Sequence, residues 1–339
     1  MPQAHVQETG HGGAGPERTG SGARRLADRW RGPGIWRRGL VIAILAVVLG
    51  LLMLLHGQIP NRVGNLGSLA ETFLPWFGLL VPVLLVLALW RRSATALIAV
   101  VLPAIAWLNL FGGLLTDKSG SGGNFTVISH NVNAENPDPA ATARSVAAAG
   151  ADVVALEELK PEAAPVYERT LAASYPYHSV QGTVGIWSKH PITDARPVDI
   201  KMGWTRALRA TVGTPQGPVG VYVAHLPSVR VKFNAGFTAG QRDNSAAALG
   251  RAIAGEQLKK VVLLGDLNGT MNDRSLAPVT SQLRSAQGAA GDGFGFSWPA
   301  SLPMARIDQI MVRGMDPVEA WTLPDTGSDH LPVAARVKL

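Results

Sequence analysis

The hydrophobic pattern divides the chain into two unlike parts. Residues 40–55, 73–90 and 94–115 form three apolar stretches that contain no ionisable side chain. Each is close to the length that an α-helix needs to cross a hydrocarbon layer of about 30 Å, the first only marginally. A cleaved signal peptide would explain the first stretch but not the other two. The pattern therefore predicts three transmembrane helices within residues 39–115, with a buried helical hairpin of a soluble protein as the alternative.

After residue 124 the pattern changes to short apolar runs, rich in β-branched residues, that alternate with Ala-rich segments of helical period. The predicted strands are residues 125–129, 153–156, 184–188, 206–212, 219–224, 261–264, 307–312 and 331–337, and the predicted helices are 140–149, 161–173 and 244–256. Strands mixed with helices, some of them adjacent as in hairpins, predict an α/β (α+β) sandwich of mixed β-sheets.

Two segments without apolar periodicity flank the predicted membrane region. Residues 1–38 are rich in Gly, Arg and polar side chains and are predicted to be a disordered basic tail. Residues 116–124, "TDKSGSGGN", have the composition of a flexible linker. Residues 125–339 are enough for one globular domain.

Composition and charge support this division. The chain is 47% hydrophobic and only 16% charged, which is typical of a protein with membrane segments, and it has no cysteine for disulfides or thiolate metal sites. Residues 1–123 carry 11 Lys or Arg against 5 Asp or Glu, whereas residues 124–339 carry 20 against 19. The near-neutral second part disfavours a strong polyanion binder. The basic tail and the Arg91–Arg92 turn predict a multi-pass cell-membrane protein with a cytoplasmic N-terminus and an extracytoplasmic globular domain.

Polar side chains stand at the ends of most predicted strands in the second part. The segments that carry them are "FTVISHNVN", "DVVALEELK", "VGVYVAHLPS", "KVVLLGDLNGT", "RIDQIMV" and "GSDHLPV". Strand ends that direct such groups to one edge create a polar site on a rigid scaffold. Carboxylates and amides without a thiol suit Mg²⁺ or Mn²⁺, and histidines beside them can hold a phosphoryl oxygen or move a proton. This combination predicts metal-assisted hydrolysis of a phosphoester.

The ordered motifs resemble the endonuclease/exonuclease/phosphatase superfamily, which includes DNase I-like nucleases, abasic-site endonucleases, inositol-polyphosphate 5-phosphatases and bacterial sphingomyelinases. The resemblance covers about residues 124–339 and is carried by "HNVN", "ALEEL", "GIWSKHPI", "AHLPS", "GDLNGT", "SWPASLPMARIDQI" and "GSDHLPV". It implies a four-layer sandwich of two mixed β-sheets flanked by helices, and a catalytic domain at residues 125–339. It also implies a Mg²⁺ or Mn²⁺ cofactor.

The resemblance implies a role for eight residues. Asn131, Glu158 and Asp329 match positions at the metal, and Asp266 matches the aspartate that orients or deprotonates the attacking water. The remaining matches are Asn268 as a phosphate contact, His225 near the leaving oxygen, His330 on the scissile phosphate, and Asp308 as the carboxylate that orients His330.

Three positions depart from the family pattern. Gln309 follows the "RID" aspartate where His or Tyr is frequent, and Asn133 replaces an aspartate of some members. Glu157 stands where the family usually has Gln, and its extra charge either tunes metal affinity or faces solvent. None of the three removes a group that the chemistry requires.

The layout of three apolar stretches, a linker and this domain also resembles the VanJ-type membrane proteins of actinomycetes, a group associated with teicoplanin-type glycopeptide resistance. That resemblance implies a lipid-linked phosphate as substrate. Other phosphoester substrates remain open at this stage: a phospholipid head group, nucleic acid or a small phosphate ester. The alternative function is an inactive membrane receptor or scaffold that retains the fold. No protein partner is inferred.

Overall fold

The computed structural model describes residues 34–62, 64–232 and 236–339. The predicted disordered tail, residues 1–38, lies outside this range except for residues 34–38, which form a turn before the first described helix.

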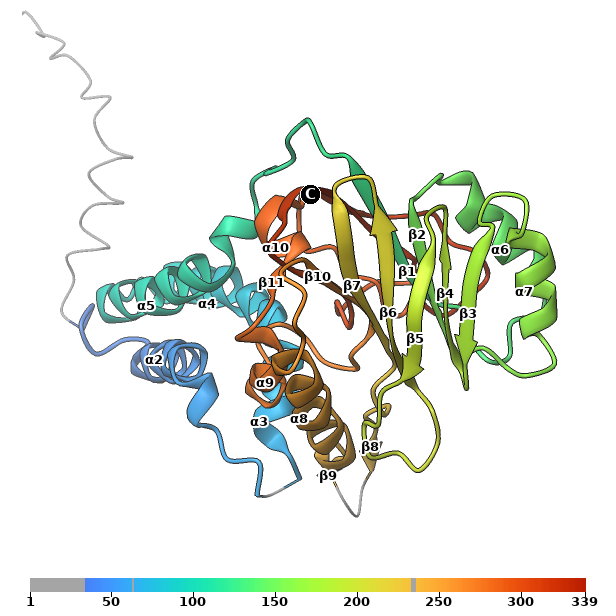
Figure 1. The fold of residues 1–339 in the computed structure, drawn as a ribbon. Coiled ribbons are helices and arrows are strands. Elements are labelled where there is room, and N and C mark those ends of the chain that lie inside the picture. The colour runs from blue at the N-terminus through green and yellow to red at the C-terminus, as the bar shows by residue number, and fades with distance from the viewer. Residues whose placement is uncertain (1–33, 63, 233–235) are drawn as a thin grey trace, which may run out of the picture.

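The chain folds into an N-terminal helical region followed by a region of mixed strands and helices (Figure 1). The α-helices are α2 (Leu40–Leu54), α3 (Leu66–Thr72), α4 (Leu80–Trp90), α5 (Ala94–Phe111), α6 (Pro139–Ala148), α7 (Ala164–Leu171), α8 (Gly240–Ala254), α9 (Ala277–Thr280) and α10 (Ala286–Ala290). Short 3-10 helices are η1 (His56–Gln58), η2 (Leu74–Leu79), η3 (Gly112–Leu114) and η4 (Arg274–Leu276). The strands are β1 (Phe125–Asn131), β2 (Val153–Glu157), β3 (Tyr177–Gln181), β4 (Val184–Ser188), β5 (Ile192–Pro197), β6 (Ala207–Thr214), β7 (Gly217–Ala224), β8 (Val231–Lys232), β9 (Gly236–Phe237), β10 (Val261–Asp266), β11 (Arg284–Ser285), β12 (Asp308–Arg313), β13 (Asp316–Thr322) and β14 (Val333–Lys338).

Two six-stranded sheets form the second region. One has the order β13-β14-β1-β2-β4-β3 and the other β11-β12-β10-β7-β6-β5. Both sheets are mixed, because β1 pairs with β2 and β7 with β10 in parallel while the other pairs are antiparallel. All eight predicted strands are present, and so are the three predicted helices as α6, α7 and α8.

The core lies in three layers of side chains. Between the sheets, residues such as Val127 and Val221 interdigitate. The outer face of the first sheet packs against α6 and α7 through a cluster that includes Trp187 and Tyr167. On the second sheet, a cluster that includes Leu263 and Leu249 packs against α8. The central strands therefore bury both faces, and the two mixed sheets flanked by helices confirm the prediction.

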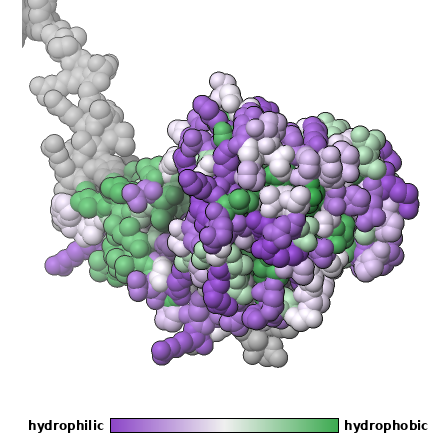
Figure 2. All heavy atoms as spheres, viewed as in Figure 1, coloured by the Kyte–Doolittle hydropathy of each residue, from purple (hydrophilic) through white to green (hydrophobic). Residues whose placement is uncertain are grey.

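Helices α2, α4 and α5 pack together at one side of the sandwich (Figure 1). Their outward faces are apolar, and Figure 2 shows this hydrophobic surface beside the mostly polar surface of the sandwich. The exposed fraction of Val41 is 70%, and that of Val86 and Ile98 is 64% each. Such a contiguous apolar surface is far larger than a soluble monomer usually exposes.

The helices of this region differ in length, and therefore in whether they could cross a membrane. Among the described residues, one helix, Ala94–Leu114, is long and apolar enough to cross a membrane. A second candidate is the pair Leu66–Thr72 and Leu74–Trp90, which is bent by 67°. Helix α2 has 15 residues, which corresponds to about 22 Å at 1.5 Å per residue. Three membrane-spanning helices therefore stay a prediction.

Helix α3 docks on the sandwich through buried polar contacts. Ser68 Oγ donates to Asp273 Oδ1 at 3.4 Å, and Asp273 Oδ2 pairs with Arg242 Nη2 at 2.6 Å. Thr270 Oγ1 donates to the carbonyl of Glu71 at 3.3 Å. The predicted linker, residues 116–124, is thus not the sole connection, and further contacts such as Trp76 Nε1 to the carbonyl of Met304 at 2.8 Å also join the N-terminal helices to the sandwich.

Candidate active site

Two carboxylates face each other across the ends of neighbouring strands. β10 and β12 are antiparallel, and their register pairs Asp266, the last residue of β10, with Asp308, the first of β12. Gly265 has φ +150°, and a Cβ there would lie 1.9 Å from the carbonyl oxygen of Ala224. The glycine of the "GDLN" motif is therefore required where β10 passes close to β7.

Asp308 fixes the orientation of the His330 side chain. Its Oδ2 accepts a hydrogen bond from His330 Nδ1 at 2.9 Å, and Ser297 Oγ donates to the same oxygen at 2.6 Å. Ser328 Oγ accepts from the backbone N–H of His330 at 3.2 Å. These contacts fix the imidazole ring so that Nε2 points toward Asp266 Oδ2, 3.9 Å away.

Asp266 is buried, and its carboxylate accepts hydrogen bonds from N–H groups of Asn131 and Asn268. Its Oδ1 accepts from the backbone N–H of Asn268 at 2.8 Å, and its Oδ2 accepts from the side-chain amides of Asn131 and Asn268, each at 3.1 Å. The Asn268 amide also donates to the carbonyl of Leu226 at 2.9 Å. In this structure Asn268 therefore positions Asp266, and a contact with phosphate would replace one of these bonds.

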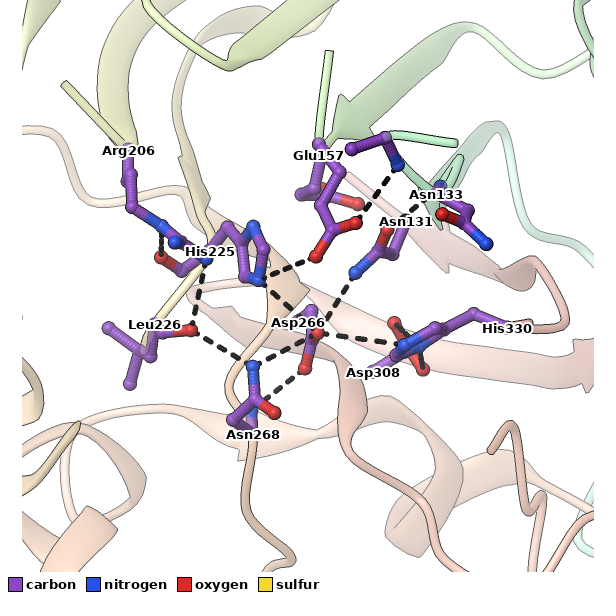
Figure 3. A network of polar contacts seen from close by, with 12 residues as sticks. Asn131, Asn133, Glu157, Arg206, His225, Leu226, Asp266, Asn268, Asp308 and His330 are labelled. Atoms are coloured by element: carbon purple, nitrogen blue, oxygen red, sulfur yellow. Dashed lines mark hydrogen bonds and ion pairs between the residues drawn. The ribbon is translucent and has the colours of Figure 1, made fainter. Parts of the chain in front are cut away.

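His225 belongs to the network drawn in Figure 3, and Glu158 lies next to it. His225 Nε2 lies 3.5 Å from Glu158 Oε1 and 3.6 Å from Asp266 Oδ2. Arg206 Nε donates to the carbonyl of His225 at 3.1 Å, which secures this strand end. Glu158 has φ +62°, and its Oε2 accepts from the backbone N–H of Ala134 at 3.1 Å.

Burial and nearby charges shift the pKa values of His330 and His225 in opposite directions. Burial lowers the pKa of His330, but the charge and hydrogen bond of Asp308 outweigh it, and with Asp266 and Asp329 they raise the pKa to about 10. Burial, followed by the charges of Arg206 and His330, lowers the pKa of His225 well below its ordinary value. The site therefore contains one protonated and one neutral imidazole at pH 7. Burial, and then the charge of Asp308, raises the pKa of Asp266.

The network opens into a cavity of about 560 Å³. Glu158, Asp266, Asp329 and His330 contribute to its wall, together with Asn268. The other lining residues are Thr72, Phe73, Ser228, Val229, Arg230, Trp298, Ala305 and Ile307. Thr72 and Phe73 belong to the apolar N-terminal region, so the cleft lies between the two parts of the chain.

The structure brings all eight predicted site residues to this cleft or the network beneath it. Asp329 is the most exposed of them, and the other seven are joined by the contacts above. Sequence reasoning missed Ser297, Arg206 and Ser328, although Ser297 lies in one of the quoted motifs.

Glu157 corrects one expectation, because its side chain does not face solvent. It is fully buried, and Ser129 Oγ donates to its Oε1 at 3.0 Å. Burial, and then the charge of Asp308, raises the pKa of Glu157 well above its ordinary value, which favours the neutral carboxyl. The extra charge expected from the departure from Gln is thereby suppressed.

The donor set fits a divalent cation. Asp266, Asp308 and His330 have one ligand atom each within 4.8 Å of one another, but His330 is protonated and hydrogen-bonded to Asp308. The donors available to a cation are therefore the carboxylates of Asp266, Glu158 and Asp329. Oxygen donors of this kind suit Mg²⁺ or Mn²⁺. Burial, and then the charge of Asp308, raises the pKa of Asp266, and a bound cation would favour its charged form.

A family comparison identifies the chain. The model of the endonuclease/exonuclease/phosphatase family matches residues 128–330. The chain belongs to this family. The match runs from β1 to His330 and so includes every predicted site residue. No curated protein matches the sequence as a whole.

Solved structures show the same fold at low sequence identity. Humanized Danio rerio TDP2 is 21% identical with a TM-score of 0.52, and the alignment covers 63% of this chain and 99% of that one. A mannosyl-6-phosphatase of Bacteroides thetaiotaomicron is 16% identical with a TM-score of 0.51, covering 64% and 100%. A functionally unknown conserved protein of Enterococcus faecalis is 15% identical with a TM-score of 0.53, covering 63% and 99%. Family members hydrolyse phosphoesters, and the apolar N-terminal region lies outside the family match.

Proposed function

We propose that this protein is a membrane-anchored, metal-dependent phosphoester hydrolase that acts outside the cytoplasm on a lipid-linked phosphate. One observation carries the proposal: the cleft that contains Asp266 and His330 is completed by Thr72 and Phe73 of the apolar region. A phosphate group at the carboxylate end of this cleft would have its apolar part directed toward that region.

Metal binding is assigned to two carboxylates that line the cleft and to the buried Asn131 beneath it. Glu158, Asn131 and Asp329 would hold Mg²⁺ or Mn²⁺, with Asp266 near enough to share it. When bound, the cation supplies Lewis-acid polarisation of the phosphoryl oxygens and neutralises their charge.

The side chains around the phosphate have different roles in the reaction. His330 is a cation fixed by Asp308, so its Nε2–H donates to a phosphoryl oxygen and stabilises the negative charge that develops there. Asp266 orients or deprotonates the attacking water, because it is buried and its pKa is raised. Neutral His225 lies 3.6 Å from Asp266 and would stand near the leaving oxygen.

Membrane anchoring through three helices rests on the apolar surface of α2, α4 and α5. Exposed side chains such as Val41, Val86 and Ile98 would otherwise face water. Basic residues in the tail and at Arg91 and Arg92 favour a cytoplasmic N-terminus, which places the sandwich outside after an odd number of spans. The layout shared with VanJ-type proteins supports the same arrangement.

A substrate panel tests the function. Full-length protein in detergent micelles with Mg²⁺ is incubated with plasmid DNA, RNA, sphingomyelin, inositol phosphates and a polyprenyl diphosphate, and His330→Ala is the matched control. We expect the lipid-linked phosphate to be hydrolysed fastest, and only by the wild type. Faster hydrolysis of nucleic acid would overturn the lipid assignment, and no turnover of any compound would favour a receptor or scaffold.

Topology is tested by a reporter fused after Lys118. Activity of a reporter that works only outside the cytoplasm is the expected result. A reporter that works only inside the cytoplasm would contradict the proposed orientation.

A further inference from the structure

A second cavity, of about 240 Å³, lies next to the catalytic cleft. Thr72 lines both cavities, so they are separated by no more than the width of one residue. Its apolar lining includes Leu110, Phe111 and Leu114 of the N-terminal region and Met271, Phe294 and Phe296 of the family domain. Its polar lining in the family domain is Thr270, Asn272, Ser285 and Arg306. The cavity thus combines apolar side chains with hydroxyl, amide and guanidinium groups.

Arg306 is a half-buried cation without a carboxylate partner in the described structure. Its Nη2 donates to Ser285 Oγ at 3.3 Å, while its Nη1 is buried and has no hydrogen-bond partner among the described residues. No Asp or Glu in the described parts of the chain lies within ion-pair distance of it, 4.0 Å. Burial lowers the pKa of Arg306 to about 10, so the guanidinium still carries its charge at neutral pH.

Two buried arginines of this protein are paired. Arg209 contacts Asp194 and Glu256, and Arg242 contacts Asp243 and Asp273. Burying a charge without a partner is costly, which explains why these two are matched with carboxylates. Arg306 is half-buried, has no such carboxylate among the described residues, and lines a cavity.

The position of Arg306 in the chain relates it to the catalytic network. It comes two residues before Asp308, and its neighbours Ala305 and Ile307 both line the catalytic cleft. Arg306 itself lines the second cavity. Residues 305–307 therefore line both cavities. The guanidinium of Arg306 lies in the second cavity, next to the cleft that would hold the reacting phosphate.

We propose that the cavity at Arg306 is a subsite for a second phosphate group of the substrate. This rests on the proposed function and narrows it: the preferred substrate carries two phosphate groups, one at Asp266 and His330 and one paired with Arg306. Guanidinium is suited to this role because its donors match phosphate oxygens in pairs. Ser285 and Asn272 offer further hydrogen-bonding groups to the same anion.

The first test measures binding in an inactive background. Dodecyl phosphate and dodecyl diphosphate share one chain and differ by a single phosphate group, and both are titrated into full-length Asp266→Asn protein with Mg²⁺. Adding Arg306→Gln should reduce the ratio of diphosphate to monophosphate affinity about 10- to 100-fold, the worth of hydrogen bonds to a charged group. Arg306→Lys should restore part of that ratio, because it keeps the charge.

A matched control is Arg336→Gln, which alters a half-exposed arginine of β14 paired with Glu319 on the neighbouring strand β13. It should leave the ratio unchanged. An equal loss for both ligands in Arg306→Gln would show a merely structural arginine and overturn the subsite, and so would an unchanged ratio.

Turnover separates the subsite from the proposed function. In the active protein, Arg306→Gln should raise KM for dodecyl diphosphate about tenfold or more and leave kcat within a few-fold. If no phosphoester is hydrolysed but diphosphate binding depends on Arg306, the subsite stands and the hydrolase proposal fails. If hydrolysis occurs with the same KM in both proteins, the subsite fails and the hydrolase proposal stands.

Discussion

Asp308 Oδ2 lies 2.9 Å from His330 Nδ1, and this pair sets the charge of the group that faces the cleft. Burial alone would favour a neutral imidazole, but the carboxylate raises the pKa of His330 to about 10. A cation is thereby available for the phosphate over the whole neutral range. In the described structure the Nδ1 atom of the nearby His225 has no hydrogen-bond partner, and burial keeps this imidazole neutral.

Asp308→Asn should lower the pKa of His330, because the amide removes the charge that opposes burial. The alkaline limb of the pH–rate profile should move to lower pH, and the titration of the His330 ring, followed by NMR, should move with it. Asp316→Asn, an exposed change on β13, is the control. An unchanged alkaline limb would show that His330 does not act as a cation in the reaction.

The same pair links stability to pH. Since the folded pKa of His330 exceeds its ordinary value near 6.5, the pair stabilises the fold fully below about pH 6.5. That contribution is lost as the pH rises through about 10. Wild type should therefore lose more stability than Asp308→Asn between pH 7 and 10 in chemical denaturation, and parallel curves would contradict the pairing.

Ser297→Ala removes the hydroxyl that donates to Asp308 at 2.6 Å. Leaving a buried carboxylate short of a donor costs about 1–3 kcal/mol, so we expect kcat to fall about tenfold or more. Ser301→Ala, an exposed change in the same loop, should have no effect on kcat. If both variants turn over like the wild type, Ser297 does not position Asp308.

Asp273→Ala removes the buried carboxylate that links Ser68 of α3 to Arg242 of the sandwich. It removes one of the two carboxylates that pair with buried Arg242, the one 2.6 Å away, while Asp243 remains at 2.7 Å, and it should cost about 1–3 kcal/mol in the free energy of unfolding. Activity should fall as well, because Arg242 Nη1 donates to the carbonyl of Asn268 at 2.9 Å. Asp292→Ala, an exposed change, is the control for denaturant unfolding.

Adding Arg242→Met to Asp273→Ala removes the arginine that has lost one of its two carboxylates, so the double variant should lose less stability than the two single changes together. Simple additivity would mean that the two residues do not act as a pair.

The sequence predicted the strands that are buried on both faces and failed on those that are not. β2 and β10 are fully buried runs of apolar residues, whereas β5 exposes most of its side chains and β3 is half-exposed, so neither shows a strong hydrophobic signal. β13, which has an irregular register against β14, was missed for the same reason.

The site residues could be predicted because their motifs occur in the order of a known family. Ser297 was not predicted, since a serine in a loop becomes informative only when the fold brings it to Asp308. The burial of Glu157 and the unpaired charge of Arg306 depend on long-range packing. No local pattern contains that information.

Hydrolysis of bis(4-nitrophenyl) phosphate by the full-length protein tests the central claim most directly. With Mg²⁺ or Mn²⁺ we expect turnover that stops on addition of EDTA and returns when the metal is restored. His330→Ala should lower the rate by about 10²- to 10⁴-fold while the protein stays folded. Turnover that survives EDTA, or that is near normal in His330→Ala, would contradict a metal-dependent hydrolase centred on Asp266 and His330.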